Sequence, residues 1–226
     1  MNITYTFLDN KIELHNDYVN SIEVLNKKYF YRLTSLIYKY SNGESVEELY
    51  FTEDDKELKL GNKIRIITDF YDFDFNNKKY INELIKIISS NSDENLLNKL
   101  NTNYNKIYKE LENIIYDVDL NFKVNINDEF SINEILKNFD LSIPSNGRLI
   151  DNLILLIDIE KRFNLNKILV FINLKQYLSK DELIEFEKYC IYNNIYVILF
   201  DNIEYSKLKK YENKIIVDKD LNEVVC

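Results

Sequence analysis

The segment from residue 167 to residue 200 constrains the fold more than any other part of the chain. Two continuous apolar runs, Ile168–Ile172 and Ile195–Phe200, flank a stretch with helical periodicity. Runs of this kind, rich in β-branched and aromatic residues, are typical of strands covered by helices on both faces. Between them, Ser179 and Glu182 have the spacing of a capping box at the start of a helix. The segment therefore predicts a βαβ unit with central, parallel strands.

Patterns earlier in the chain extend this unit into a larger α/β domain. Alternating apolar residues on either side of Asp9 predict a hairpin at the N-terminus. A short strand at 21–25 and a helix at about 27–40 follow, and 49–52 and 63–68 have the composition of two more strands. The charged segment between these last two is expected to be a connection. Together these elements predict a parallel sheet flanked by helices.

After residue 70 the pattern becomes helical. Apolar residues recur there at alternating spacings of three and four: Leu97, Leu100, Tyr104, Ile107, Leu111, Ile114 and Val118. Such a narrow stripe suits pairing with another long helix, and either the apolar residues of 149–163 or a helix from another subunit would serve. Residues 118–126 then alternate with the period of a strand. We predict an α/β head formed by residues 1–70 and 146–226, with residues 71–145 inserted as a helical leg.

Composition limits the partners of this chain. Hydrophobic residues make up 46% of its 226 residues, which is enough for a globular core. No segment has the length of a membrane span, and the N-terminus lacks the pattern of a signal peptide, so we expect a cytoplasmic protein with no membrane partner. A net charge of -9 discourages nucleic-acid binding. The sequence nevertheless contains two clusters of basic residues, which could be DNA-binding patches or ordinary solvated helix faces. They are Lys27, Lys28 and Arg32, and Lys207, Lys209 and Lys210.

The residues that common enzymes need are missing. The turn after the strand at 21–25 contains no glycine, whereas a phosphate-binding loop depends on glycines for close backbone approach. Asn173 directly follows the apolar run Ile168–Ile172, at a position where a nucleotide hydrolase would be expected to have a metal-organising carboxylate. His15 is the one histidine in the sequence, which disfavours a nucleophilic triad. The open alternative is a metal-dependent nucleotide hydrolase or nuclease that uses Asp69, Asp201 or an acidic group.

That acidic group follows the heptad segment. It consists of Asp117, Asp119, Asp128, Glu129 and Glu134, with Asn121 and Asn125 as possible carbonyl ligands. Hard cations such as calcium take six to eight oxygen ligands of these types. The spacing is not that of an EF-hand, and a solvated polar face explains the same residues without a metal.

Several segments together resemble a known family, the small accessory protein of type II-A CRISPR systems that is needed to acquire new spacers. The likeness is carried by Ile168–Asn173, Tyr177–Glu182 and Asn194–Phe200, and also by Met1–Asp9, Ile67–Asp69, Phe73–Asp74 and Ile132–Leu141. The resemblance implies a P-loop-NTPase-like head with a degenerate nucleotide site and an inserted helical leg. It also implies a homotetrameric ring that threads double-stranded DNA ends, bound calcium near the leg, and cooperation with the CRISPR integrase and the RNA-guided nuclease.

Residues are carried over from the family at few positions. Asp128, Glu129 and Glu134 match acidic positions of the family and Arg32 matches a basic one, while Asn121, Lys123 and Asn125 replace a carboxylate-rich stretch. Clustering alone selects Lys27, Lys28, Lys209 and Lys210 for the DNA surface. We therefore expect a non-enzymatic protein that binds DNA ends during spacer acquisition in antiviral defence. A purely structural protein, assembled through the heptad helix, is the third interpretation.

Overall fold

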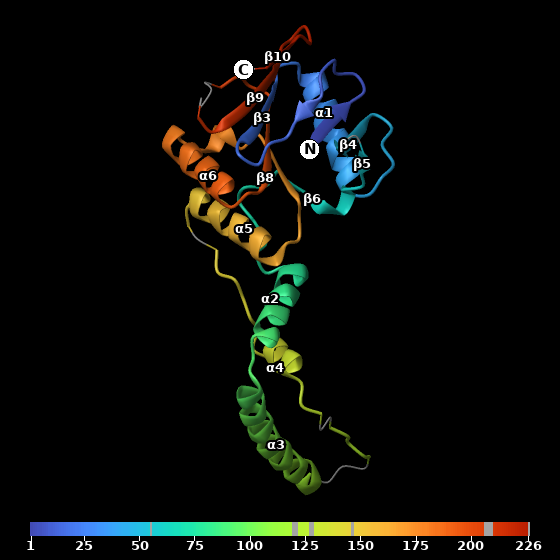
Figure 1. Ribbon diagram of the computed structural model, residues 1–226. Coiled ribbons are helices and arrows are strands. Elements are labelled where there is room, and N and C mark those ends of the chain that lie inside the picture. Colours follow the sequence, from blue (N-terminus) through green and yellow to red (C-terminus); the bar gives the residue numbers. More distant parts are fainter. Residues whose placement is uncertain (55, 119–121, 127–128, 146, 206–209, 226) are drawn as a thin grey trace. The chain divides into compact units, whose positions relative to one another are not determined.

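The computed structural model describes residues 1–54, 56–118, 122–126, 129–145, 147–205 and 210–225 (Figure 1). The chain divides into two compact units. One contains Met1–Asp74 and Ser145–Cys226, and is called the head here. The other, Phe75–Pro144, is called the leg. The leg is thus an insertion between the two sequence segments that build the head.

A mixed sheet forms the centre of the head. Among the described residues its six strands lie in the order β10-β9-β3-β8-β7-β6. They are β3 (Val19–Val24), β6 (Ile64–Ile67), β7 (Ile168–Ile172), β8 (Tyr196–Asp201), β9 (Glu212–Val217) and β10 (Glu223–Val225). All neighbours pair in parallel except β10, which runs antiparallel to β9. The predicted α/β class is therefore confirmed, with a largely parallel sheet.

The predicted βαβ unit is present as β7, α6 (Lys180–Tyr192) and β8. The strands are central and parallel, with Ile168 opposite Tyr196 and Ile172 opposite Phe200. Ser179 forms the predicted capping box with Glu182, whose side chain accepts from the N–H of Ser179. The local sequence signals of this segment were sufficient because each strand is buried on both faces and the helix start is marked chemically.

A second, antiparallel sheet is formed by β1 (Asn2–Tyr5), β2 (Ile12–Glu13), β4 (Leu49–Glu53) and β5 (Lys56–Leu58), in the order β2-β1-β4-β5. Helix α1 (Lys27–Ser41) contributes Leu33, Leu36 and Ile37 to a core that also contains residues from both sheets. Tyr5 is completely buried in this core, and its hydroxyl donates to the carbonyl oxygen of Leu33 at 3.4 Å. The side chains of α1 therefore link the small sheet to one face of the large sheet.

Helix α5 (Leu149–Phe163) packs against α6. It buries Ile150, Leu153, Leu156, Ile157 and Ile159 within the head. At its C-terminal half, Glu160 is buried, pairs with Arg65 at 2.8 Å and accepts from Asn166 at 2.7 Å. The apolar face of 149–163, expected as one possible partner for the heptad helix, is thus occupied in covering the sheet with α6.

The leg contains α2 (Lys78–Ser90), α3 (Glu94–Asp117) and α4 (Ile132–Asn138). Helices α2 and α4 are in contact, and the Ser89 hydroxyl donates to the Asn133 side-chain oxygen at 2.5 Å. The Asn76 side chain joins the two ends of the leg segment, because it exchanges two hydrogen bonds with the backbone of Ile143 at 2.7 and 3.2 Å. The rings of Tyr104 in α3 and of Phe130, which lies just before α4, are 5.9 Å apart between their centres.

One local prediction was wrong. The charged connection predicted before residue 60 contains the strand β5, in which Lys56 pairs with Glu53 of β4. For 118–126 a short strand or an extended segment was expected, and the described residues of that segment, 118 and 122–126, form neither a helix nor a strand. No described helix has both the length and the apolar composition to cross a membrane.

Candidate nucleic-acid interface

The first turn of α1 presents two cations to solvent. Lys27 and Lys28 are both exposed. Positive charges are disfavoured at a helix N-terminus by the helix dipole, so these lysines do not serve to stabilise α1. The helix start is capped instead by Asn26, whose side-chain oxygen accepts from the N–H groups of Lys28 and Tyr29 at 3.1 and 3.4 Å. The arrangement leaves the two ammonium groups available to an anionic partner.

Arg32 has contacts of its own in the head. Its guanidinium pairs with the carboxylate of Glu48 and lies 3.9 Å from the centre of the Phe7 ring. About 42% of the side chain is exposed. Of the three basic residues selected on α1, Lys27 and Lys28 are thus exposed to solvent, whereas Arg32 joins α1 to residues next to the strands β1 and β4.

The second basic cluster is partly described. Lys210 is exposed and its Nζ lies 5.6 Å from the centre of the Tyr211 ring. Lys188 of α6 approaches the same ring at 5.4 Å. Lys207 and Lys209 lie outside the described residues. Lys188 was missed because only the fold brings residues 188 and 211 together.

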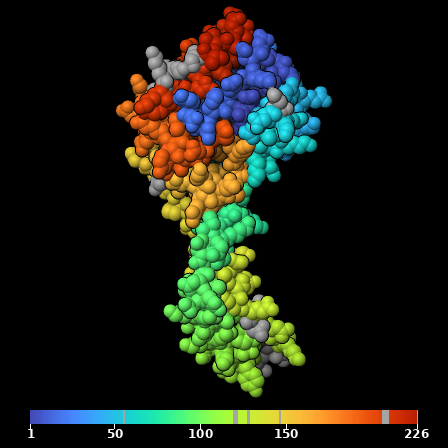
Figure 2. All heavy atoms as spheres, in the orientation of Figure 1, coloured from blue at the N-terminus to red at the C-terminus, as the bar shows by residue number. Residues whose placement is uncertain are grey.

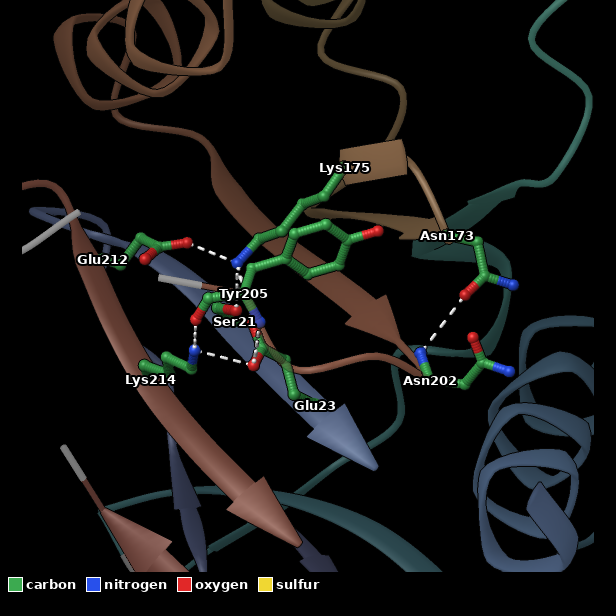
Figure 3. A network of polar contacts seen from close by, with 8 residues as sticks. All are labelled: Ser21, Glu23, Asn173, Lys175, Asn202, Tyr205, Glu212 and Lys214. Atoms are coloured by element: carbon green, nitrogen blue, oxygen red, sulfur yellow. Dashed lines mark hydrogen bonds and ion pairs between the residues drawn. The ribbon is translucent and has the colours of Figure 1, made fainter. Parts of the chain in front are cut away.

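The residue that follows β7, where a metal-organising carboxylate would be expected in a nucleotide hydrolase, is Asn173. Asn173 has a left-handed backbone with φ of 58°. Its N–H donates to the carbonyl of Phe200 at 2.7 Å, and its side-chain oxygen accepts from the N–H of Asn202 at 3.3 Å (Figure 3). Asn173 therefore joins the ends of β7 and β8.

The two acidic residues considered for catalysis have different environments. Asp69 is exposed and caps a turn, because its carboxylate accepts from the N–H groups of Tyr71 and Asp72 at 2.8 and 3.3 Å. Asp201, at the end of β8, is completely buried. Asp69 thus caps a turn at the surface, whereas Asp201 lies in the interior of the head.

The head contains a buried polar network (Figure 3). Asp201 interacts electrostatically with three of its members, Lys175, Glu23 and Glu212. Lys175, from the short helix η2 (Lys175–Tyr177), donates to Ser21 at 2.7 Å, to Glu23 at 3.1 Å and to Glu212 at 2.5 Å. Lys214 pairs with the other oxygen of Glu23 at 2.7 Å. The strand period brings these groups together, since Ser21 and Glu23 alternate on β3 and Glu212 and Lys214 on β9.

Burial and opposite charge act against each other on Lys175. Burial favours the neutral amine, but the carboxylates of Glu212 and Glu23 outweigh it, so the pKa of Lys175 is raised. The ammonium form is therefore stable inside the head. Sequence reasoning missed this network because its members are separated by up to 193 positions, from Ser21 to Lys214.

The acidic group selected for calcium is only partly described. Asp117 ends α3, Glu134 lies in the first turn of α4, and Glu129 lies between them; all three are exposed. Asp119, Asp128 and Asn121 lie outside the described residues. Within the described part of the chain, no three acidic, histidine or cysteine side chains are arranged to hold a metal ion.

These features define an α/β protein with a helical insertion and exposed cations at the start of its first long helix. A sequence model of the family "CRISPR-associated protein (Cas_Csn2)" matches residues 39–221, which is most of the chain. The protein therefore belongs to this family, and membership gives it a CRISPR-associated role in adaptation, as the sequence resemblance predicted.

Solved structures give a likeness of fold. The crystal structure of Stu0660 of Streptococcus thermophilus matches with a TM-score of 0.61 and 14% identity, over 96% of this chain and 75% of the other. An ABC-transporter ATP-binding protein from Pyrococcus furiosus matches with a TM-score of 0.42 and 9% identity, over 95% and 97%. The second likeness is too weak to carry an argument. No curated protein matches the sequence.

Proposed function

We propose that this protein binds the ends of double-stranded DNA as a homotetrameric ring during spacer acquisition, without breaking bonds itself. Membership of the family over residues 39–221 is the observation that carries the proposal. Exposed Lys27 and Lys28 supply phosphate-binding charge on a chain whose net charge is -9. A ring would gather such cations from several copies around one cavity, where their field adds.

We further propose that the head is a P-loop-like domain whose nucleotide site has been lost. The turn between β3 and α1 has no glycine, and Asn26 occupies the N–H groups that a phosphate would need. At the end of β7, Asn173 replaces a metal-organising carboxylate and bonds to Asn202. A phosphate at the start of α1 would need the N–H groups that the Asn26 side chain already occupies, so the two cannot be bound there together.

Calcium is proposed as a ligand of the leg. Asp117 places a negative charge at the C-terminal end of α3, where the helix dipole is itself negative. A divalent cation near this end would relieve that repulsion. The proposed ligands are Asp117, Asp119, Asp128, Glu129 and Glu134. The integrase and the RNA-guided nuclease of the same CRISPR system are proposed as partners that receive the bound DNA.

Assembly is supported by the surface of the leg. No residue of α3 is buried, and its apolar stripe includes Ile107, Leu111 and Ile114, which are 61%, 46% and 58% exposed. In Figure 2 the side chains of α3 form part of the leg surface. An exposed stripe of this length is typical of a helix that pairs with another copy of the chain.

A binding experiment tests the proposal directly. A short blunt-ended duplex and the same duplex closed by hairpins at both ends are compared, with and without calcium. We expect tighter binding of the open duplex and a fall in log affinity of about 0.9 per contacted phosphate for each log unit of salt. Equal binding of the open and closed duplexes would argue against end recognition, and no dependence on salt would argue against phosphate contacts.

Charge reversal separates the α1 lysines from the general charge of the chain. Lys27→Glu with Lys28→Glu should weaken binding to all duplex sequences alike and reduce the salt dependence. Lys56→Glu with Lys59→Glu is the matched control, because it makes the same change in net charge at exposed positions in and next to β5. Equal losses in the two variants would remove α1 from the proposed interface.

A further inference from the structure

The buried network of the head contains more carboxyl groups than ammonium groups. Its two cations are Lys175 and Lys214, which are 3% and 2% exposed. Four buried carboxyls belong to the same network: Glu23, Glu187, Asp201 and Glu212. Burying an uncompensated charge costs several kcal/mol per ion. Two of the four carboxyls are therefore expected to carry protons.

The contacts identify which two. Glu23 and Glu212 accept from the ammonium groups, so their charged forms are compensated. Neither Glu187 nor Asp201 forms an ion pair with the two ammonium groups, which are held by Glu23 and Glu212. Glu187 interacts instead with the Glu212 side chain, and Asp201 with the backbone N–H of Lys175. These two carboxyls are therefore the ones for which the neutral form is favoured by burial.

The two differ in the pH at which they ionise. Burial raises the pKa of Glu187 to about 9, and Glu212 adds to this while Lys175 opposes it. Burial raises the pKa of Asp201 to about 7, against the effect of Lys175 and with those of Glu23 and Glu212. Of these two groups, only Asp201 changes charge near neutral pH.

The network also holds a segment of backbone. The N–H of Tyr205 donates to Glu23 at 3.0 Å, and the carbonyl of Tyr205 accepts from Lys214 (Figure 3). These two bonds are called the Tyr205 tether here. Glu23 and Lys214 are in turn joined to each other, so both ends of the tether depend on the charge state of one ion pair.

Lys175 has no donor left for an ionised Asp201. An ammonium has three hydrogens, and those of Lys175 are directed to Ser21, Glu23 and Glu212. If Asp201 loses its proton, its carboxylate competes with Glu23 for the same ammonium. The two carboxylates also repel each other, so Glu23, which accepts the hydrogen bond from the Tyr205 N–H, is held less firmly in place.

We propose that this network is a proton-linked device, in which one proton on the Asp201 carboxyl preserves the Tyr205 tether and its loss near neutral pH weakens the tether. The groups facing Asp201 are Lys175 from η2, Glu23 from β3, Glu212 from β9 and the phenol of Tyr205. From α6, Glu187 faces Glu212 and stays protonated over the same range. The device lies in the head and is independent of the proposed DNA binding.

Nuclear magnetic resonance tests the proposal in the unmodified protein. The Asp201 carboxyl carbon should titrate between about pH 6 and about pH 8, and the hydrogen-exchange protection of the Tyr205 amide should fall by about tenfold over the same interval. An Asp201 carboxyl that is ionised at all of these pH values would overturn the proposal. A carboxyl that titrates while Tyr205 keeps constant protection would also overturn it.

A variant then assigns the effect to Asp201. Asp201→Asn keeps the shape of the side chain but cannot ionise, so the protection of the Tyr205 amide should no longer depend on pH. Asp220→Asn makes the same chemical change at an exposed position and should retain the wild-type transition. If Asp201→Asn retained the transition as well, another group would control the tether.

Discussion

Lys175 and Glu212 form an ion pair of 2.5 Å between Nζ and Oε1, with both side chains almost completely buried. The pair joins η2, which follows β7, to the first residue of β9. Because β9 lies next to β3, and Glu23 of β3 holds the same ammonium at 3.1 Å, one side chain connects three elements of the head. Lys175 therefore links η2 to two neighbouring strands of the sheet, β3 and β9, in the interior of the head.

Removal of this ammonium is expected to destabilise the head. Lys175→Met should lower the free energy of unfolding by about 3 to 5 kcal/mol, because Glu23 and Glu212 would keep buried charges without their common partner. Urea denaturation measures the change. Lys180→Met, at an exposed position in the first turn of α6, should alter it by less than about 0.5 kcal/mol. Similar values for the two variants would contradict the role given to Lys175.

The stability of the protein should depend on pH through Glu187. With the pKa raised to about 9, the folded chain keeps a proton that the unfolded chain releases above its ordinary value near 4.5. Stability therefore falls as pH rises between those two values. Glu187→Gln should remove this loss and stabilise the protein by up to about 5 kcal/mol near pH 8.

Urea denaturation at a series of pH values checks the effect of Glu187. The difference between Glu187→Gln and wild type should shrink toward acid pH, because both chains are then neutral at this position. Glu185→Gln, on the exposed part of α6, is the matched control and should follow the wild-type curve. A constant difference at all pH values would show that packing, and not ionisation, sets the effect.

Sequence patterns predicted those parts of the head in which the signal is local. The β7-α6-β8 unit is an example, because continuous apolar residues and the Ser179–Glu182 box lie within 34 positions of one another, from 167 to 200. Strand β5 was missed because a charged segment such as Lys56–Leu58 becomes a strand only by pairing with β4. Its pairing is a tertiary effect that overrides local preference.

The buried network could not be predicted from the sequence for a related reason. In β3, Ser21 and Glu23 alternate with apolar residues, a pattern that normally indicates one solvated face. The structure places both in the interior, where Lys175 and Lys214 compensate them. No sequence signal near Ser21 or Glu23 indicates that their partner, Lys175, lies more than 150 positions away.

The start of α6 offers a test of the capping box. Ser179→Ala should lower the free energy of unfolding by about 0.5 to 2 kcal/mol, because the N–H of Glu182 loses its acceptor. Thermal and urea denaturation measure this loss. Ser45→Ala, at an exposed position outside any helix or strand, is the control and should have little effect. Loss of stability in both variants alike would argue against a capping role.

The stripe on α3 gives a test of assembly. Ile107 and Ile114 are 61% and 58% exposed, so glutamate at these positions places no buried charge in a single chain. In an assembly that covers the stripe, the same two charges would lie in an apolar interface and weaken it. We therefore expect Ile107→Glu with Ile114→Glu to reduce the mass in solution toward the 27.2 kDa of one chain, with unchanged helix content by circular dichroism.

The matched control for the stripe is Asn98→Glu with Asn105→Glu. These residues are exposed on the opposite face of α3 at the same spacing of seven, and the change in charge is identical. Light scattering should give this variant the wild-type mass. If both variants dissociated, general repulsion between acidic chains would explain the result. If neither did, or if the wild-type protein itself had the mass of one chain, the stripe would not be the surface on which a ring is built.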